Sequence, residues 1–520
     1  MGLLLSKLPW TDLAPDLPVG ATPIGYAWMV RSEGLRVMPH HRWSFVAAVG
    51  ARSRYAFQGL EWEVFPRRTF EPSSPAEHIE HALKYDGLNL EILRAWFAAA
   101  QASAVTSLAA WITDKPSSAY ARRAWYLYEL LTGERLALPD ASAVPFVPLL
   151  DPAEAFTGPT LRSRRHRVDA NLMGGPDFSV MVRRTPFLEA CGAEDWSTLA
   201  RQALGEADAG TLLRAVTWLY TKETRSSYEI EREAPSADRV QRFVTTLKAA
   251  QDLPALDKAA LIRLQNQIVT DPRNHDADWR ETQNYVSRGN AAPEYISPQP
   301  EALPALMEGW LGMLAGLMQA PVDPVVAAAA AAFSFVYLHP FEDGNGRIHR
   351  FLIHYVLARR GFTPKDAILP VSAVILARPR EYDAALEAFS IPVVERLVYE
   401  IDSMGVLLVQ GDSASLYRHM DLTVQAEALY RWVQHTIREE LPRELRFVRA
   451  FHDAFASVHA EIELPDRVLQ PLVARTLENK GRLSKARRDR DFKHLEPALL
   501  DRAEALVRAA MAAAGLEVEP

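Results

Sequence analysis

The sequence feature that most constrains the fold is an uncharged, alanine-rich run at residues 325–338, which ends in large apolar side chains. Alanine costs little to hold in a helix, and a helix without a polar face has to be buried on all sides. The run is shorter than the roughly 20 apolar residues that cross a membrane. Asp323 and His339 flank it. It therefore predicts a helix inside a hydrophobic core, with other helices packed around it.

A polar loop with the sequence HPFEDGNGRIHR, residues 339–350, follows this run. Apolar residues then recur at helical spacing and predict a second helix that starts near Arg347; they are Ile348, Phe351, Leu352, Tyr355 and Val356. Gly344 and Gly346 can adopt backbone angles that are closed to other residues. Their N–H groups can therefore turn toward one anion at the positive end of the helix.

The charged side chains of the loop fit the same ligand. Arg347 and Arg350 are three residues apart, share a helix face, and offer the forked donors that match phosphate oxygens. Asp343 is a hard oxygen ligand of the kind Mg²⁺ uses together with substrate phosphates. His339 can take a proton from a hydroxyl near neutral pH. A plain polar loop between two core helices is the alternative, but it does not explain why these residues occur together.

Residues 339–350 resemble the active-site motif of the Fic family, H-P-F-x-[D/E]-G-N-G-R-x-x-R, and match every specified position. The resemblance implies a mostly α-helical core with a short β-hairpin flap. It also implies a nucleotidyltransferase that moves AMP from ATP to a Ser, Thr or Tyr hydroxyl of a target protein, with the chain itself as one candidate target. Removal of AMP and transfer of another phosphoryl group are alternatives. Gly346 stands where the phosphotransferase branch has a lysine.

The resemblance also assigns roles to single residues. His339 is the implied base, Asp343 the Mg²⁺ ligand, and Gly344 and Gly346 part of the phosphate-binding loop. Asn345 and Arg347 are implied to hold the inner phosphates of ATP, and Arg350 the γ-phosphate. Tyr382 belongs to a Tyr-x-x-x-Leu segment that the family often places near the adenine. Packing in the core explains Tyr382 nearly as well.

Residues 227–232 resemble the inhibitory segment of the same family, [S/T]-x-x-x-E-[G/N], with Ser227 and Glu231 in register. The resemblance implies that Glu231 pairs with Arg350 and so occupies the place of the ATP γ-phosphate. Arg232 departs from the pattern, which has Gly or Asn there. A solvated helix is the alternative.

Further on, β-prone pieces at 278–286 and 295–298 flank a Gly-Asn turn and predict a hairpin. This hairpin is either the flap of the Fic family or an ordinary surface hairpin.

Three domains are expected: a mainly helical N-terminal domain at 1–204, the Fic core with its inhibitory segment at 205–412, and a helical C-terminal domain at 413–520. Apolar stretches at 43–49, 79–100 and 104–131 are expected to be mostly helices. C-terminal helices are expected near 426–436, 445–460 and 467–477.

Composition narrows the class of protein. The net charge is −7, from 58 basic and 65 acidic residues, so bulk electrostatics do not indicate a nucleic-acid binder. Cys191 is the one cysteine, which excludes a disulfide framework and predicts a reducing, cytoplasmic location. No membrane segment is expected. Basic clusters at 162–167 and 480–493 leave open a DNA-binding regulator that modifies itself, although a solvated surface is the favoured interpretation of both.

Overall fold

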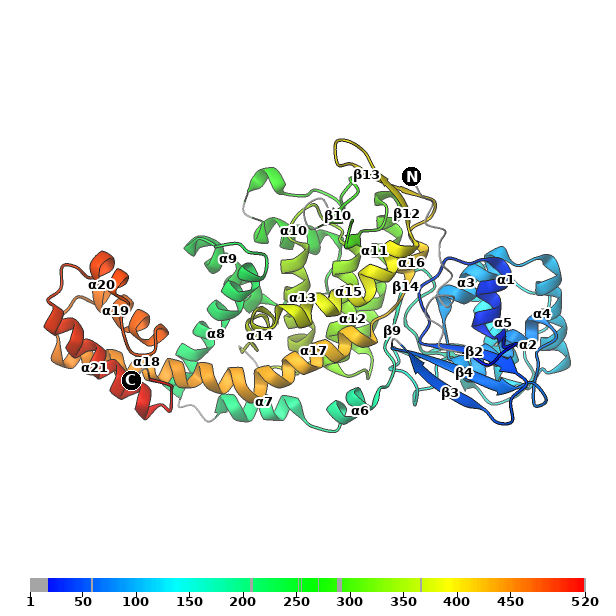
Figure 1. The fold of residues 1–520 in the computed structure, drawn as a ribbon, viewed down its shortest axis with the longest axis horizontal. Helices are drawn as coiled ribbons and strands as arrows, with labels where there is room; N and C mark the ends of the chain where they lie inside the picture. The colour runs from blue at the N-terminus through cyan, green and yellow to red at the C-terminus, as the bar shows by residue number, and fades with distance from the viewer. Residues whose placement is uncertain are drawn as a thin grey trace. The chain divides into compact units, whose positions relative to one another are not determined.

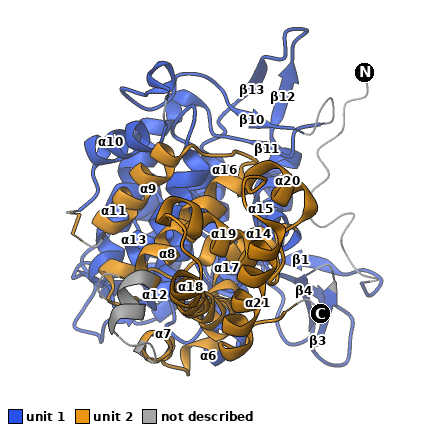
Figure 2. Cartoon of the chain, turned by 90° about the vertical axis from the view of Figure 1, so that its left-hand side faces the viewer, with its two compact units in different colours: residues 1–190, 254–356, 380–428 blue, residues 191–253, 357–379, 429–520 orange. Residues whose placement is uncertain are grey.

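The computed structural model describes residues 17–57, 59–205, 209–250, 252–253, 255–269, 271–287, 292–364 and 367–518. Figure 1 shows the chain as a ribbon, and Figure 2 shows its two compact units, each built from three stretches of sequence. Unit 1 comprises Met1–Ala190, Pro254–Val356 and Arg380–Ala428, and unit 2 comprises Cys191–Leu253, Leu357–Pro379 and Leu429–Pro520. The predicted mostly helical fold is confirmed. The division into domains at 1–204, 205–412 and 413–520 stays a prediction.

The first part of unit 1 combines a four-stranded sheet with helices. The strands are β1 (Thr22–Ile24), β2 (Arg42–Ala47), β3 (Ser53–Phe57) and β4 (Leu60–Pro66), in the order β1-β2-β4-β3. The helices are α1 (Tyr26–Glu33), α2 (Pro75–His81), α3 (Leu90–Ala99), α4 (Ala102–Asp114) and α5 (Ala119–Thr132), with a π-helical turn at Ala82–Asp86. The helices expected at 79–100 and 104–131 are largely confirmed.

The helix expected at 43–49 is wrong, because residues 43–47 of this stretch belong to strand β2. Trp43, Phe45 and Val46 are aromatic or β-branched, and such side chains pack well on a pleated surface. β2 lies between β1 and β4, so its backbone groups are paired on both edges. Burial on both faces removes the alternation that normally distinguishes a strand from a helix.

Short strands complete the N-terminal part of unit 1. One sheet contains β5 (Val147–Pro148), β6 (Leu161–Ser163) and β7 (Val168–Ala170), and another contains β8 (Met173–Gly174), β9 (Ser179–Met181) and β14 (His419–Asp421). β14 runs parallel to β9, so the last stretch of unit 1 pairs with the first. In the basic cluster at 162–167, Arg162 pairs with Asp169 at 2.8 Å and Arg165 with Glu129 at 2.8 Å.

A helical core carries the motif within unit 1. Its main helices are α10 (Lys258–Ile268), α11 (Leu303–Gln319), α12 (Pro324–Leu338), α13 (Asn345–Arg359) and α15 (Pro379–Arg396). Asp323 caps α12 by accepting hydrogen bonds from Val325 N at 2.8 Å and Val326 N at 3.1 Å. Nearly every residue of α12 is buried, as predicted. Trp310 of α11 donates its indole N–H to Ser334 Oγ at 2.9 Å and so fixes the two helices side by side.

Two hairpins accompany this core. The predicted hairpin is confirmed as β10 (Tyr285–Val286) paired with β11 (Tyr295–Ile296); its Gly-Asn turn lies outside the described residues. We call it the flap hairpin. A second hairpin joins β12 (Val398–Ile401) to β13 (Leu407–Gln410), followed by the short helix α16 (Ser415–Arg418). Single-turn 3₁₀ helices lie at Pro272–Asn274 and Pro300–Ala302.

Unit 2 is helical. It contains α7 (Trp196–Gly205), α8 (Ala209–Ile230), α9 (Ala237–Ala249), α14 (Val371–Ala377), α18 (Leu441–Glu461), α19 (Asp466–Glu478), α20 (Lys485–Asp491) and α21 (Pro497–Ala513). Like α13, α6 (Pro186–Gly192) and α17 (Thr423–His435) begin in unit 1 and end in unit 2. A π-helical turn at Thr436–Glu440 joins α17 to α18. The predicted C-terminal helices are confirmed. Among the described helices, none alone has the length and hydropathy to cross a membrane, whereas the bent pair α3 and α4 passes that test together.

Candidate functional site

His339 ends helix α12 in a left-handed conformation, with φ 49° and ψ 58°. Its backbone N–H donates to Phe335 O at 3.0 Å and completes the last turn of the helix. The ring Nδ1 lies 3.2 Å from Val336 O. Because a carbonyl only accepts hydrogen bonds, Nδ1 carries the proton of the neutral ring and Nε2 is the basic nitrogen.

The surroundings of His339 keep its imidazole neutral. Desolvation by the surrounding protein, together with the positive charge of Arg280, lowers the pKa of His339 to about 4. The nearby Asp343 carboxylate acts in the opposite direction but does not outweigh desolvation. At neutral pH the ring is therefore able to accept a proton.

Arg280 joins the motif loop to the flap hairpin. Its Nε donates to His339 O at 2.8 Å, Nη1 to Thr282 O at 2.5 Å, and Nη2 to Pro298 O at 2.6 Å. Its backbone N–H donates to Pro340 O at 2.8 Å. The residue is only 3% exposed. One buried guanidinium thus fixes the backbone of His339 against the segments on either side of the flap hairpin.

Side chains of the flap hairpin and its flank also contact the motif. The Tyr295 hydroxyl donates to Tyr337 O at 2.5 Å, and the Tyr295 ring centroid lies 5.8 Å from that of His339. Thr282 Oγ1 donates to Glu342 Oε1 at 2.6 Å. The flap hairpin is therefore held beside the histidine that we expect to act as the base.

The backbone of the motif loop is fixed from inside. Asn345 donates Nδ2 to Phe341 O at 2.7 Å and accepts from Phe341 N at 3.1 Å. The Phe341 side chain is fully buried. Gly344 has φ 88°, and a Cβ there would lie 3.0 Å from Val269 Cγ2, so the residue has both a conformational and a steric reason to be glycine. The Asn345 carboxamide closes the loop, and helix α13 begins at this residue.

Asp343 and Arg347 form the charged centre of the site. Asp343 Oδ1 accepts from Gly344 N at 2.6 Å and from Arg347 Nη2 at 2.9 Å. The Asp343 side chain is 43% exposed, whereas that of Arg347 is buried. The ion pair therefore lies at the first turn of α13, where unpaired N–H groups and the helix dipole favour an anion.

The donor set tests whether this site suits Mg²⁺. Asp343 Oδ2 has no hydrogen-bond partner among the described residues, so a carboxylate oxygen is available. The described part of the chain contains no cluster of three His, Cys, Asp or Glu residues arranged for a metal. A single carboxylate fits Mg²⁺ when phosphates supply further oxygen ligands. Burial raises the pKa of Asp276, and the negative charges of Glu342 and Asp343 raise it further. Three carboxyl groups therefore lie near one another beside the motif loop.

Residues 255–357, which include the motif, α12 and most of α13, match the model of the Fic/DOC family. They form a Fic domain. "Protein adenylyltransferase fic-1" of Caenorhabditis elegans is 41% identical over 93 residues, which are 18% of this chain and 16% of that protein. "Protein adenylyltransferase Fic" of Nematostella vectensis is 36% identical over 86 residues, 16% of this chain and 19% of that protein. The chain thus spans less than a fifth of these relatives.

Among solved structures, a Fic family protein from Desulfovibrio desulfuricans G20 aligns with 64% of this chain and 87% of its own. The sequence identity is 19% and the TM-score is 0.37. A likeness of this size carries no argument about the arrangement of the chain, so the Fic domain is identified from its sequence match.

The remaining predicted nucleotide contacts lie on α13 and α15. Arg350 follows Arg347 by nearly one turn of α13 and is buried. Tyr382 is buried on α15, and its ring centroid lies 6.2 Å from that of His349. His349 is itself fixed by Ala332 O of α12, 2.8 Å from its Nδ1. The structure therefore brings Tyr382 to the helix that carries both arginines. The catalytic role of His339, the metal role of Asp343 and all the nucleotide roles stay predictions; the nucleotide roles are those of Gly344, Asn345, Gly346, Arg347, Arg350 and Tyr382.

The predicted inhibitory segment lies at the end of α8 in unit 2. Ser227 is buried within the helix, and Glu231 follows its last residue with its N–H donated to Tyr228 O at 3.0 Å. Arg232 has φ 60°. Glycine and asparagine adopt left-handed angles more readily than other residues, which explains why the family pattern has them at this position. Arg232 keeps the left-handed turn at a conformational cost, and the inhibitory role of Glu231 stays a prediction.

Helix α8 is anchored within unit 2 by a buried carboxylate. Glu223 accepts hydrogen bonds from Ser372 N at 2.9 Å and from Ser372 Oγ. Ser372 lies in the first turn of α14, where N–H groups have no partner within the helix. Glu223 therefore satisfies the start of α14 from the middle of α8 and anchors α8 about two turns before Glu231.

Two site residues were missed by the sequence reasoning, Arg280 and Gln265. Gln265 is buried on α10 and donates Nε2 to Asn274 O at 3.0 Å and to Asp343 O at 3.3 Å. Neither residue belongs to the motif. No local spacing distinguishes a buried arginine or glutamine that binds backbone carbonyls from a solvated one, so only the fold reveals them.

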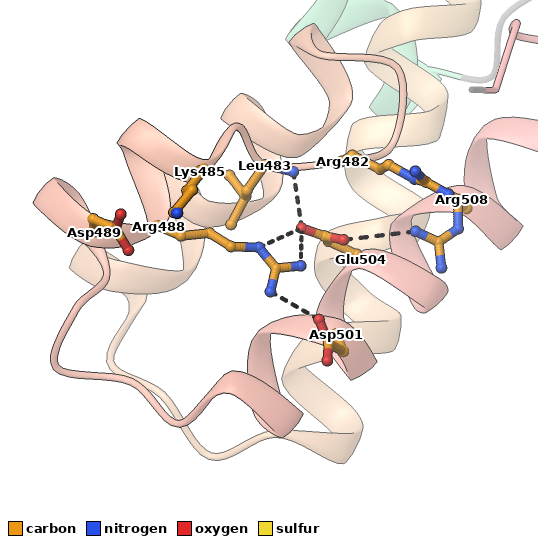
Figure 3. Close-up of a pocket in the computed structure, with 8 residues that line it drawn as sticks. All are labelled: Arg482, Leu483, Lys485, Arg488, Asp489, Asp501, Glu504 and Arg508. Carbon is orange, nitrogen blue, oxygen red and sulfur yellow. Dashed lines mark hydrogen bonds and ion pairs between the residues drawn. The ribbon is translucent and has the colours of Figure 1, made fainter. Parts of the chain in front are cut away.

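A separate pocket of about 480 Å³ lies among the C-terminal helices of unit 2 (Figure 3). It is lined by Arg482, Leu483, Lys485, Arg488, Asp489, Asp501, Glu504 and Arg508. The buried Glu504 accepts from Leu483 N at 2.8 Å and from Arg488 Nη2 at 2.6 Å, and Asp501 accepts from Arg488 Nη1 at 2.8 Å. These ion pairs neutralise part of the basic stretch at 480–493.

Proposed function

We propose that the chain is a protein adenylyltransferase, which transfers AMP from ATP to a Ser, Thr or Tyr hydroxyl of a target protein. The observation that carries the proposal is the state of His339. Its ring is neutral, its Nδ1 proton is fixed on Val336 O, and its Nε2 is left basic beside the phosphate-type loop. The adenylyltransferase names of the matched relatives support the same reaction.

The reaction balances with this chain's own residues. The target hydroxyl gives its proton to Nε2 of His339 while its oxygen forms a bond to the α-phosphorus of ATP. The bond from that phosphorus to the bridging oxygen breaks, and pyrophosphate leaves with the electron pair. Arg347, Arg350 and the N–H groups of the first turn of α13 would balance the negative charge of the phosphates. Arg280 keeps the backbone of His339 in place during this step.

Asp343 is the residue that would hold Mg²⁺ in this enzyme, through the carboxylate oxygen that Gly344 and Arg347 leave available. The ion would supply positive charge to the phosphates as pyrophosphate leaves. The Asp343–Arg347 pair would also keep the arginine side chain oriented toward the nucleotide.

The proposal includes inhibition by Glu231. A carboxylate that pairs with Arg350 would compete with the γ-phosphate of ATP for one guanidinium. Glu223 anchors α8, and the left-handed Arg232 follows Glu231 directly, which supports an ordered backbone at this carboxylate. Replacing Glu231 with glycine should raise the transfer rate. Glu229→Gly, which removes an exposed carboxylate from the same helix end, is the matched control and should leave the rate nearly unchanged.

The test of the base uses His339→Ala with α-labelled ATP and Mg²⁺, in the Glu231→Gly background. A positioned base contributes about 10²- to 10⁴-fold in rate, so label on protein should fall by that factor. ATP affinity, measured by calorimetry, should stay within about threefold, because the phosphates bind to α13 and its arginines. If ATP affinity falls as far as the transfer rate, His339 acts in binding and the assigned role is wrong.

A further inference from the structure

The hairpin of β12 and β13 is attached at its tip to the flap hairpin and at its base to the segment that follows the flap hairpin. At its tip, Gly405 O accepts a hydrogen bond from the Tyr285 hydroxyl at 2.9 Å. At its base, Val409 O accepts from Gln299 Nε2 at 3.2 Å, and Gln299 N donates to Ser413 Oγ at 3.0 Å. Figures 1 and 2 both show β12 and β13 beside β10, extending beyond the neighbouring helices. We call this element the tip hairpin.

The tip hairpin exposes large apolar side chains that its own fold does not need. Met404 is 83% exposed, Val406 48% and Leu408 60%. The turn is closed by Asp402, whose Oδ1 accepts from Met404 N at 2.8 Å and from Val406 N at 2.9 Å. Polar or small residues would serve that turn equally well. Apolar side chains gathered on an ordered, projecting element mark an interaction surface.

The position of the tip hairpin relative to His339 limits what it can bind. The Tyr295 ring lies 5.8 Å from the His339 ring, and Tyr295 pairs with Val286, the neighbour of Tyr285. From the Tyr295 strand it is one strand spacing to the strand of Tyr285, and the Tyr285 side chain reaches from there to Gly405. This places the tip on the order of 15–20 Å from the base, or about five residues of extended chain at roughly 3.3 Å per residue.

We propose that the tip hairpin binds an apolar side chain of the target protein, in an extended segment and about five residues from the hydroxyl that receives AMP. This rests on the proposed transfer function and adds a recognition site to it. A strand that pairs with the flap hairpin is held by its main chain, which leaves specificity to side-chain contacts beyond the paired residues. Met404, Val406 and Leu408 supply such a contact.

A second copy of this chain fits the surface less well. Even with Val398 and Ile401 of β12 included, the exposed apolar side chains of this hairpin present on the order of a few hundred Å². That is below the roughly 800 Å² per partner that a stable interface buries. A surface of this area is large enough to cover one apolar side chain of a bound segment. The continuity of the tip hairpin with the flap hairpin also places it where a segment leaving the catalytic site would pass.

The experiment is a positional scan of peptides with a central Ser, Thr or Tyr. Each peptide carries one Leu, one Lys or neither at offsets up to about eight residues on either side. The full chain with Glu231→Gly is compared with the same chain carrying Met404→Asp and Val406→Asp, with α-labelled ATP as donor. Leu161→Asp, which changes an equally exposed apolar residue of unit 1 (72% exposed), is the matched control. Self-labelling reports the transfer chemistry independently of the peptides.

The expected result is a preference of about tenfold in kcat/KM for Leu near offset five in the parent and in Leu161→Asp. In the double variant the preference for Leu should be lost, and peptides with Lys at the same offset should be preferred instead. The reason is that two carboxylates then replace two apolar side chains. Self-labelling with an unchanged peptide preference would overturn the tip-hairpin proposal alone. Absence of all labelling, including self-labelling, would instead refute the proposed function and the inference with it. A parent dimer that becomes monomeric in the double variant would also overturn it.

Discussion

Arg280 is the residue for which we expect the clearest effect. Its three side-chain hydrogen bonds all go to backbone carbonyls, and one of these carbonyls belongs to His339. The change is Arg280→Lys. An ammonium group on a flexible stem can replace one of the three bonds that the rigid guanidinium makes. Two bonds from a charged donor are then lost, at about 1.5 kcal/mol each, so the variant should be destabilised by about 3 kcal/mol.

The effect on catalysis follows from the bond to His339 O, which is 2.8 Å long in the native protein. A shift of the base by about 1 Å costs roughly 10²-fold in rate. We therefore expect kcat for AMP transfer to fall about 10²-fold while KM for ATP stays within about threefold. Steady-state transfer with α-labelled ATP and thermal unfolding measure the two effects separately.

The matched control is Arg396→Lys. Arg396 is also largely buried in unit 1 and donates to two carbonyls, Val37 O at 2.6 Å and Pro392 O at 2.7 Å. By the same reasoning Arg396→Lys loses one of its two carbonyl bonds, so it should lower the free energy of unfolding by about 1.5 kcal/mol but leave kcat unchanged. An Arg280→Lys enzyme with normal kcat, or an Arg396→Lys enzyme with equally impaired kcat, would refute the positioning role.

Two further outcomes follow from the site. The neutral form of His339 is the active one and its pKa is lowered to about 4. The transfer rate should therefore stay nearly flat from about pH 8 to about pH 5 and fall only toward pH 4. An acid limb centred near 6.5, the ordinary histidine value, would contradict this. Arg232→Gly should stabilise unit 2 by about 0.5–1 kcal/mol in urea unfolding, because glycine relieves the left-handed angle of 60°. Lys480→Gly, at φ 53°, should raise the free energy of unfolding by a similar amount for the same reason. An Arg232→Gly variant that is less stable than the parent would contradict this explanation.

The elements that the sequence predicts well are those whose signal is local. The alanine-rich run of α12 is buried because its own residues leave it no polar face, and the motif loop is read from twelve consecutive positions. The flap hairpin follows from two β-prone pieces and a turn signal. The signal for each of these three elements comes from residues that are neighbours in the sequence, so no tertiary contact is needed to predict it.

What the sequence did not predict depends on residues that are distant along the chain. Arg280 acquires its role from His339, 59 positions later, and the tip hairpin acquires its place from Tyr285, 120 positions earlier. Strand β2 was expected as a helix because its pairing with β1 and β4 buries both faces and hides the strand pattern. The position of Glu231 relative to Arg350 likewise depends on segments far apart in sequence and stays a prediction.

The central claim is that AMP, and not a phosphoryl group, is transferred to protein. The most direct measurement incubates the Glu231→Gly chain with ATP labelled on the α-phosphate or, in parallel, on the γ-phosphate. We expect the protein to retain the α label, the γ label to leave as pyrophosphate, and the α label to be lost when His339→Ala is introduced. Protein that retains the γ label would contradict the claim.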